Sequence, residues 1–326
     1  MAAIDRSHIS VRNRGWNIHA IARVVRLMGD ASQSALHGRE ARAFALSWSA
    51  ALLTGCAVPG PQSPRAMINE LERASVADNA GAFVSYLRAG EPQAPRIIYV
   101  HGSPGDAKAF ADDLVDPLPG FESISIDRPG FGEARDRGPV TGFEAQAQAI
   151  EPLLVEHDGR WPILVGHSLG GPIIARAAAD YPDRVGGLVI VAGSLDPELE
   201  ELKWFNHLAA AAAVRWLVPR ALRVSNDEMF AARAETELLA GVLDRVRCPV
   251  VIIHGVNDGL VPYDNVRYTQ RMLTNAASIE VVTFKDQGHF VVWQAEGRAA
   301  IRDAIRSIAE SGGTASGNHP DRSHPQ

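Results

Sequence analysis

From about residue 81 onward, short apolar runs alternate with longer segments of helical periodicity, and this alternation constrains the fold more than any other feature. Most of the apolar runs are continuous, which is typical of strands buried on both faces. They lie at 96–102, 121–127, 161–166, 187–193, 249–255 and 279–284. Helical patterns lie between or after them at 142–157, 169–179, 263–273 and 293–309. Strands that alternate with helices predict βαβ units, so we expect an α/β fold with at least six strands in a mostly parallel, twisted sheet flanked by helices.

Several segments fall outside this alternation. Residues 82–90 (AFVSYLRAG) alternate in polarity and predict an edge hairpin strand. Residues 196–245 carry no strand pattern but contain an alanine run and a capping box at 225–228, and we interpret them as a small helical cap inserted between two sheet strands. Such insertions lie at the sheet edge where loops carry the chemistry. We expect a tether over 56–80, the α/β domain over 81–310, and a disordered tail over 311–326.

Charge and cysteine content exclude several classes of function. The net charge is −6, and seven arginines lie within the first 55 residues, so the remaining chain is more acidic still. An acidic body disfavours nucleic acid as a partner. The two cysteines, Cys56 and Cys248, are too few for a disulfide scaffold or a cysteine zinc site. No metal-ligand spacing and no phosphate-binding glycine loop occurs in the sequence, so we expect neither a metal nor a cofactor.

The segment before Cys56 predicts a membrane anchor. Residues 43–55 (AFALSWSAALLTG) are apolar and follow Arg39 and Arg42. They are too few to span a bilayer but have the length of a signal-peptide apolar region. The sequence Leu-Thr-Gly-Cys at 53–56 resembles a bacterial lipobox, which implies cleavage before Cys56 and lipidation of its thiol. We therefore expect attachment to a membrane of the bacterial cell envelope, with the domain facing the periplasm or the exterior.

The leader over 1–55 is unusually long for such a signal, so we suspect that residues 1–27 reflect a misassigned start codon. Two alternatives remain open. The arginines among the apolar residues of 12–26 are also compatible with a basic amphipathic presequence or surface helix. Residues 43–56 are also compatible with a buried helix and an ordinary cysteine in a cytoplasmic protein.

Residues 166–170 (GHSLG) match the G-x-S-x-G pattern of a nucleophile elbow. The pattern alone is weak, but a buried strand precedes it and a helical pattern follows, so Ser168 is expected on a tight strand-to-helix turn. The glycines avoid side-chain clashes there and leave the hydroxyl exposed. The N-terminus of the following helix favours developing negative charge.

A serine hydroxyl needs a base to take its proton, and that base needs an acid to orient it. In this architecture the chain order is Ser, then Asp or Glu, then His. Asp258 follows the run at 249–255, and His289 follows the run at 279–284, so both stand just past predicted parallel strands. Asp196, after the run at 187–193, is an alternative position for the acid.

An oxyanion hole needs two N–H groups directed at the developing charge. We expect one from Leu169, directly after the serine, and the other from Ser103 in the loop 101–105 (HGSPG). Pro104 has no N–H to donate, so it is excluded as the second oxyanion donor. We expect the neighbouring His101, His167 and His254 to be structural.

Together the motifs at 100–105, 127–132, 166–171, 254–262 and 288–290 resemble the serine-nucleophile members of the α/β-hydrolase fold superfamily. The resemblance covers about 81–310, with the cap in the usual place. It implies a serine hydrolase with an esterase-like or lipase-like triad of Ser168, His289 and Asp258 and a small-molecule acyl substrate. A serine at 168 speaks against resemblance to haloalkane dehalogenases and epoxide hydrolases.

The resemblance is poorly specific for the substrate. The same triad serves carbon–carbon bond hydrolysis, peptidase and perhydrolase chemistry, and these remain alternatives to cleavage of an ester or related acyl bond. A non-catalytic binding protein on the same fold is an alternative from another class, although such proteins usually lack the elbow or a triad member. Likeness of fold alone does not supply the substrate or the oligomeric state.

Overall fold

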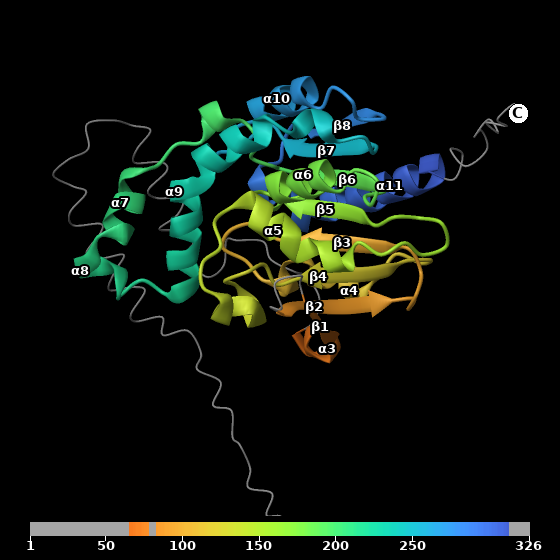
Figure 1. Cartoon of the computed structure of the whole chain (residues 1–326), viewed down its shortest axis with the longest axis horizontal. Helices are drawn as coiled ribbons and strands as arrows, with labels where there is room; N and C mark the ends of the chain where they lie inside the picture. Colours follow the sequence, from red (N-terminus) through yellow and green to blue (C-terminus); the bar gives the residue numbers. More distant parts are fainter. Residues whose placement is uncertain (1–64, 78–82, 313–326) are drawn as a thin grey trace, which may run out of the picture. The chain divides into compact units, whose positions relative to one another are not determined.

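The computed structural model describes residues 65–77 and 83–312. Eight strands form one sheet in these ranges, in the order β1-β2-β4-β3-β5-β6-β7-β8 (Figure 1). The strands are β1 Glu72–Ala77, β2 Phe83–Gly90, β3 Arg96–Val100, β4 Glu122–Ile126, β5 Ile163–His167, β6 Gly187–Val191, β7 Val250–Gly255 and β8 Ile279–Phe284. β2 pairs antiparallel with β1 and β4, and all other neighbouring pairs are parallel. The expected α/β class with a mostly parallel sheet is confirmed.

Helices cover both faces of the sheet (Figure 1). They are α3 Arg65–Glu70, α4 Ala111–Val115, α5 Phe143–Ile150, α6 Gly170–Asp180, α7 Trp204–Ala210, α8 Ala212–Arg215, α9 Arg220–Ala240, α10 Asp264–Met272 and α11 Ala295–Gly312. None of the helices in the described ranges is long and apolar enough to cross a bilayer.

The central strands are apolar along their whole length because both of their faces are buried. In β3, Ile98 and Val100 belong to the core that includes residues of α5 and α6. The alternate residues Ile97 and Tyr99 belong to the second core, which includes residues of α11. Successive side chains of a strand point to opposite faces, and here both faces are buried. The strand therefore carries an unbroken apolar sequence instead of an alternation of apolar and polar residues.

Two expectations at the start of the domain were wrong. Residues 65–77, placed within a tether, form α3 and β1, so the sheet begins before residue 81. Consequently β2 is not an edge strand but lies between β1 and β4. The sequence of β1, ERASVA, hides this because an edge strand keeps one side exposed and needs few large apolar residues.

The chain ends show a smaller difference. Helix α11 continues to Gly312, so it includes the first two residues assigned to the tail. The rest of the tail, the leader over 1–55 and Cys56 lie outside the described residues.

The cap between β6 and β7 is helical, as expected, and contains α7, α8 and α9. Figure 1 places these helices at the side of the sheet toward which β3 points. The expected capping box was wrong, because residues 225–228 lie inside α9, whose N-cap is Pro219. The pattern Ser-x-x-Glu marks a helix start only where the preceding residues are not helical, and here the first turn of α9 precedes it.

Candidate active site

Ser168 lies on a sharp turn between β5 and α6. Its φ angle is +54°, in the left-handed region that costs energy for a residue with a side chain. The flanking glycines make the turn possible: a Cβ on Gly166 would lie 2.4 Å from the Gly170 oxygen, and one on Gly170 would lie 2.2 Å from the Val100 oxygen. Ser168 itself remains partly exposed. This is the geometry of an accessible serine held on a strained strand-to-helix turn.

His289 and Asp258 meet at the same edge of the sheet. His289 follows β8 and its Nδ1 lies 2.8 Å from Oδ2 of Asp258, which follows β7. Asp258 Oδ1 accepts hydrogen bonds from the N–H groups of Leu260, at 2.9 Å, and Val261, at 2.8 Å. Burial raises the pKa of the Asp258 carboxyl, but hydrogen bonds from His254 and His289 outweigh it and hold the pKa below its usual range. The carboxylate is thus ionised and oriented toward the imidazole.

The alternative acid, Asp196, has a different partner. It is the N-cap of a short turn at Pro197–Leu199, and its Oδ1 accepts the N–H of Glu198 at 3.0 Å. The structure therefore brings His289 to Asp258 and uses Asp196 to cap a turn.

His167 connects the serine turn to the His289 loop. Its ring lies 4.8 Å from the His289 ring, centroid to centroid, and its Nε2 lies 3.0 Å from the His289 carbonyl oxygen. Burial, with the neighbouring His289 ring, lowers the pKa of His167 to about 3, so this ring is neutral. A neutral ring donates from Nε2 to that carbonyl, which places His289 beside the residue that precedes Ser168.

His254 has a contact that sequence reasoning missed. It lies in β7, is 1% exposed, and its Nε2 lies 3.3 Å from Asp258 Oδ2 and 3.1 Å from the Val261 oxygen. We had expected a purely structural residue, yet it contacts the acid directly. The signal available in the sequence is the spacing of His254 and Asp258, because a strand end and the following turn fold back on each other.

The loop after β3 also lies against Ser168. A Cβ on Gly102 would lie 2.9 Å from the Ser168 Cβ, so the loop 101–105 and the serine are in close contact. Among the hydrogen bonds of the described residues, the N–H groups of Ser103 and Leu169 have no acceptor. Both N–H groups are therefore available to a ligand.

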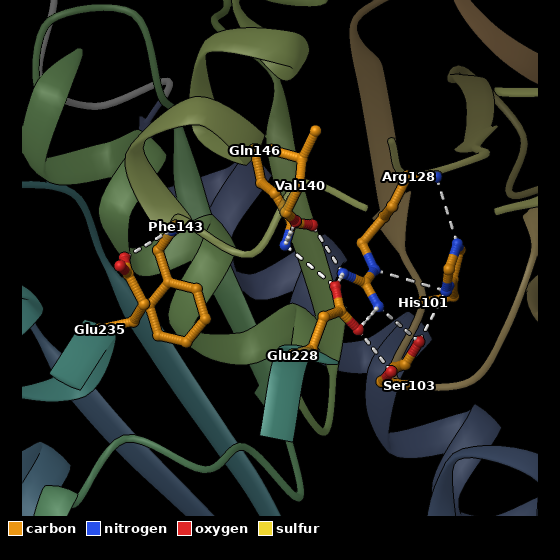
Figure 2. A network of polar contacts seen from close by, with 9 residues as sticks. His101, Ser103, Arg128, Val140, Phe143, Gln146, Glu228 and Glu235 are labelled. Atoms are coloured by element: carbon orange, nitrogen blue, oxygen red, sulfur yellow. Dashed lines mark hydrogen bonds and ion pairs between the residues drawn. The ribbon is translucent and has the colours of Figure 1, made fainter. Parts of the chain in front are cut away.

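A buried ionic network holds this loop, as Figure 2 shows. Arg128 follows β4 and is 0% exposed, and its Nη1 donates to Glu228 Oε1 in α9 at 2.6 Å. Arg128 Nη2 donates to the Gly102 oxygen at 2.9 Å. His101 Nδ1 lies 2.7 Å from the same oxygen, and its Nε2 accepts the Arg128 backbone N–H at 3.2 Å. Burial, reinforced by Arg128, lowers the pKa of His101 well below its usual range, so the ring is neutral with its proton on Nδ1.

The sequence did not predict these partners. Asp127 and Arg128 are neighbours in the sequence, but each pairs with a remote residue. Asp127 pairs with Arg73 of β1 and accepts the Ala107 N–H at 2.8 Å. Glu228 lies 100 residues from Arg128, a separation that no local pattern encodes.

Two remaining features bear on the chemistry. Cys248 is buried, and burial raises the pKa of its thiol to about 12, so it is an inert structural residue. Within 65–77 and 83–312, no group of three or more His, Cys, Asp or Glu side chains is placed to hold a metal ion.

Comparison with known proteins places these motifs in a family context. Residues 95–216 match the family model for the alpha/beta hydrolase fold, and residues 158–310 match that of the prolyl oligopeptidase family. A 2-succinyl-6-hydroxy-2,4-cyclohexadiene-1-carboxylate synthase from Enterobacter is 28% identical over 172 residues, which cover 53% of this chain and 64% of that protein. A 2-hydroxy-6-oxononadienedioate/2-hydroxy-6-oxononatrienedioate hydrolase from Pseudomonas is 24% identical, over 61% of this chain and 82% of that protein.

Among solved structures, a monoacylglycerol lipase from Paleococcus ferrophilus is similar, with a TM-score of 0.56 and 22% identity. The match covers 74% of this chain and 99% of that one. This likeness bears on the fold. The chain spans less than two thirds of the length of the first curated relatives it matches. The names of the curated relatives describe different reactions.

Proposed function

We propose that the chain is a hydrolase that cleaves a carboxylic ester or related acyl bond of a small molecule through an acyl-enzyme. The match of residues 95–216 to the alpha/beta hydrolase fold model supports this class of enzyme. The observation that carries the proposal is the 2.8 Å contact between His289 and Asp258 at the sheet edge that also presents the strained, accessible Ser168. Nucleophile, base and acid then come from three separate loops after parallel strands.

In the proposed mechanism, Ser168 attacks the substrate carbonyl while His289 accepts the hydroxyl proton. Asp258 fixes the proton on Nδ1 of His289, which leaves Nε2 free to accept, and stabilises the imidazolium that forms. The N–H groups of Ser103 and Leu169 bind the oxyanion. His289 returns the proton to the leaving group, and water then hydrolyses the acyl-enzyme with His289 again as base.

The test is labelling with a fluorophosphonate probe, which reacts with an activated serine. Ser168→Ala is expected to abolish labelling while the protein keeps its fold by circular dichroism. Ser194→Ala is the matched control, because Ser194 also follows a parallel strand but is buried and bonds to Glu200. Undiminished labelling of the Ser168→Ala variant would reject the assignment.

A second candidate is carbon–carbon bond hydrolysis by the same residues. This reaction is favoured by the similarity to the Pseudomonas hydrolase of 2-hydroxy-6-oxononadienedioate. The match to the prolyl oligopeptidase family is the reason to include amide substrates in the test as well. A panel of short and long p-nitrophenyl esters, thioesters, aminoacyl amides and a 2-hydroxy-6-oxo-dienoate separates these reactions. The highest kcat/KM identifies the bond type.

We also propose that Cys56 carries a lipid that anchors the domain to a membrane of the bacterial envelope. The support is the apolar segment 43–55 with its preceding arginines and the Leu-Thr-Gly-Cys sequence. Intact-mass analysis of the protein from the membrane fraction is the test. An N-terminus other than acylated Cys56 would reject this proposal without affecting the catalytic one.

A further inference from the structure

Glu228 occupies an unusual position for a carboxylate. It lies in the middle of the cap helix α9, it is 2% exposed, and both of its oxygens are fully used. Oε1 accepts Arg128 Nη1 at 2.6 Å and Gln146 Nε2 at 3.0 Å. Oε2 accepts Arg128 Nη2 at 3.2 Å and also the Ser103 hydroxyl. The cap helix thereby contacts the loop after β3 through two separate routes.

The first route acts on the peptide between Gly102 and Ser103. The carbonyl of Gly102 and the N–H of Ser103 belong to one planar trans peptide group and point in opposite directions. Arg128 Nη2 and His101 Nδ1 both bind the Gly102 oxygen, at 2.9 Å and 2.7 Å. Fixing this oxygen fixes the direction of the Ser103 N–H.

The second route acts on the Ser103 side chain. Its hydroxyl donates to Glu228, so the hydroxyl is directed toward the cap. Of the hydrogen-bonding groups of Ser103, the N–H is then the one left without an acceptor among the described residues. Both routes end on the same carboxylate and define one peptide orientation (Figure 2).

Stability alone is a weak reason for such an arrangement. A buried ion pair loses so much hydration that a well-packed apolar pair of similar volume is often equally stable. Directional hydrogen bonds, in contrast, determine an orientation that apolar packing does not. The network thus fits a requirement for geometry at the Gly102–Ser103 peptide.

We propose that Glu228 is a positioning residue, which orients the Ser103 N–H through Arg128 and through the Ser103 hydroxyl and so couples the seating of the cap helix to the oxyanion hole. This inference rests on the proposed function. It assigns to the cap a role in the rate of the chemical step.

The experiment measures kcat, KM and the melting temperature of Glu228→Gln on the best p-nitrophenyl ester. Removal of one oxyanion donor costs about 10²–10³-fold in kcat, so a misdirected donor is expected to cost about 10–100-fold with KM little changed. Glu235→Gln is the matched control: it lies seven residues further along α9 and ties the helix to α5 by accepting the Phe143 N–H at 2.8 Å. It does not touch the loop 101–105, and kcat should remain near the wild-type value even if the melting temperature falls.

Ser103→Ala covers the case in which Glu228→Gln does not fold. It keeps the backbone N–H and the Arg128–Glu228 pair and removes only the hydroxyl tether, so we expect a smaller fall in kcat in the same direction. Ser103→Thr, which retains a hydroxyl, should recover most of the loss. The positioning role is overturned if Glu228→Gln and Glu235→Gln lower kcat equally, or if folded Ser103→Ala keeps the wild-type kcat. A wild-type protein that neither turns over an ester nor reacts with the fluorophosphonate would reject the proposed function itself.

Discussion

The loop after β3 contacts Ser168, and the loop after β8, which holds His289 against Asp258, contacts the neighbouring His167, but different kinds of partner hold these loops. Asp258 and His289 bind each other and nearby backbone groups, such as the N–H groups of Leu260 and Val261. The loop 101–105 is held by a buried guanidinium and by a carboxylate that belongs to the cap. The proposed acid–base side, Asp258 with His289, therefore depends on the sheet, whereas the proposed oxyanion side, the loop 101–105, depends on the sheet and the cap together.

This difference has a consequence for how the two sides respond to change. The acid–base side is held by residues of neighbouring strands and their loops, including His167 at the end of β5, so its geometry follows the pairing of β5 to β8. The oxyanion side includes a contact between residues 128 and 228, so anything that moves α9 also acts on the Gly102–Ser103 peptide. If Glu228 positions the Ser103 N–H as proposed, a substrate that displaces α9 alters transition-state stabilisation without touching Asp258 or His289.

The largest expected effect comes from the acid–base side. Asp258→Asn should lower kcat about 10⁴-fold, because an amide in this position favours the wrong tautomer of His289. Steady-state kinetics on the best ester, with circular dichroism to verify folding, measures it. Asp196→Asn is the matched control, since Asp196 caps a turn and should leave kcat close to wild type. The reverse result, a large loss with Asp196→Asn alone, would transfer the acid role to Asp196.

The next effect is on stability and concerns the oxyanion side. Arg128→Met leaves the buried Glu228 carboxylate without its counter-ion, which should lower the free energy of unfolding by about 3–5 kcal/mol. Urea denaturation measures this. Adding Glu228→Leu to the variant removes the second charge and should restore most of the loss.

Arg215→Met provides the control for that experiment. Arg215 makes a bidentate ion pair with Asp227, at 2.8 Å and 2.7 Å, but both side chains are partly exposed. Loss of this pair should therefore lower the free energy of unfolding by under about 1 kcal/mol. Equal costs for the two arginines would mean that charge does not hold the loop after β3, and the contrast between the two sides of the site would disappear.

Elements whose structure follows from a local pattern were predictable from the sequence, and elements held by remote contacts were not. The central strands and the elbow were predictable because a buried parallel strand has an apolar run of its own, and the residues 166–170 carry their geometry locally. The positions of Asp258 and His289 follow from the rule that parallel strands end at one edge. In contrast, β1 was missed because an edge strand is half exposed and its composition resembles a linker.

The charged network was not predictable for a different reason. Glu228 was interpreted as part of a helix start, because Ser-x-x-Glu is a local signal and its actual partner, Arg128, is 100 residues away. His254 was likewise placed correctly in a strand, but its contact with Asp258 depends on the turn that follows β7. Sequence patterns report local structure and burial, and they do not report which remote charges meet.

The smallest expected effect tests whether the acid–base side and the elbow tolerate small changes equally well. Gly170→Ala would put a Cβ 2.2 Å from the Val100 oxygen, at the end of β3, so α6 must move away from the strand. Overpacking of this kind costs about 1–3 kcal/mol, and the shift should also lower kcat because it separates the elbow from the loop 101–105. Gly259→Ala, beside Asp258, adds a methyl to open space and should change neither quantity. Melting temperature and kcat of both variants provide the comparison. If Gly259→Ala proved as damaging as Gly170→Ala, the acid loop would be as tightly constrained as the elbow, and the local hydrogen bonds of Asp258 would no longer be a sufficient account of its position.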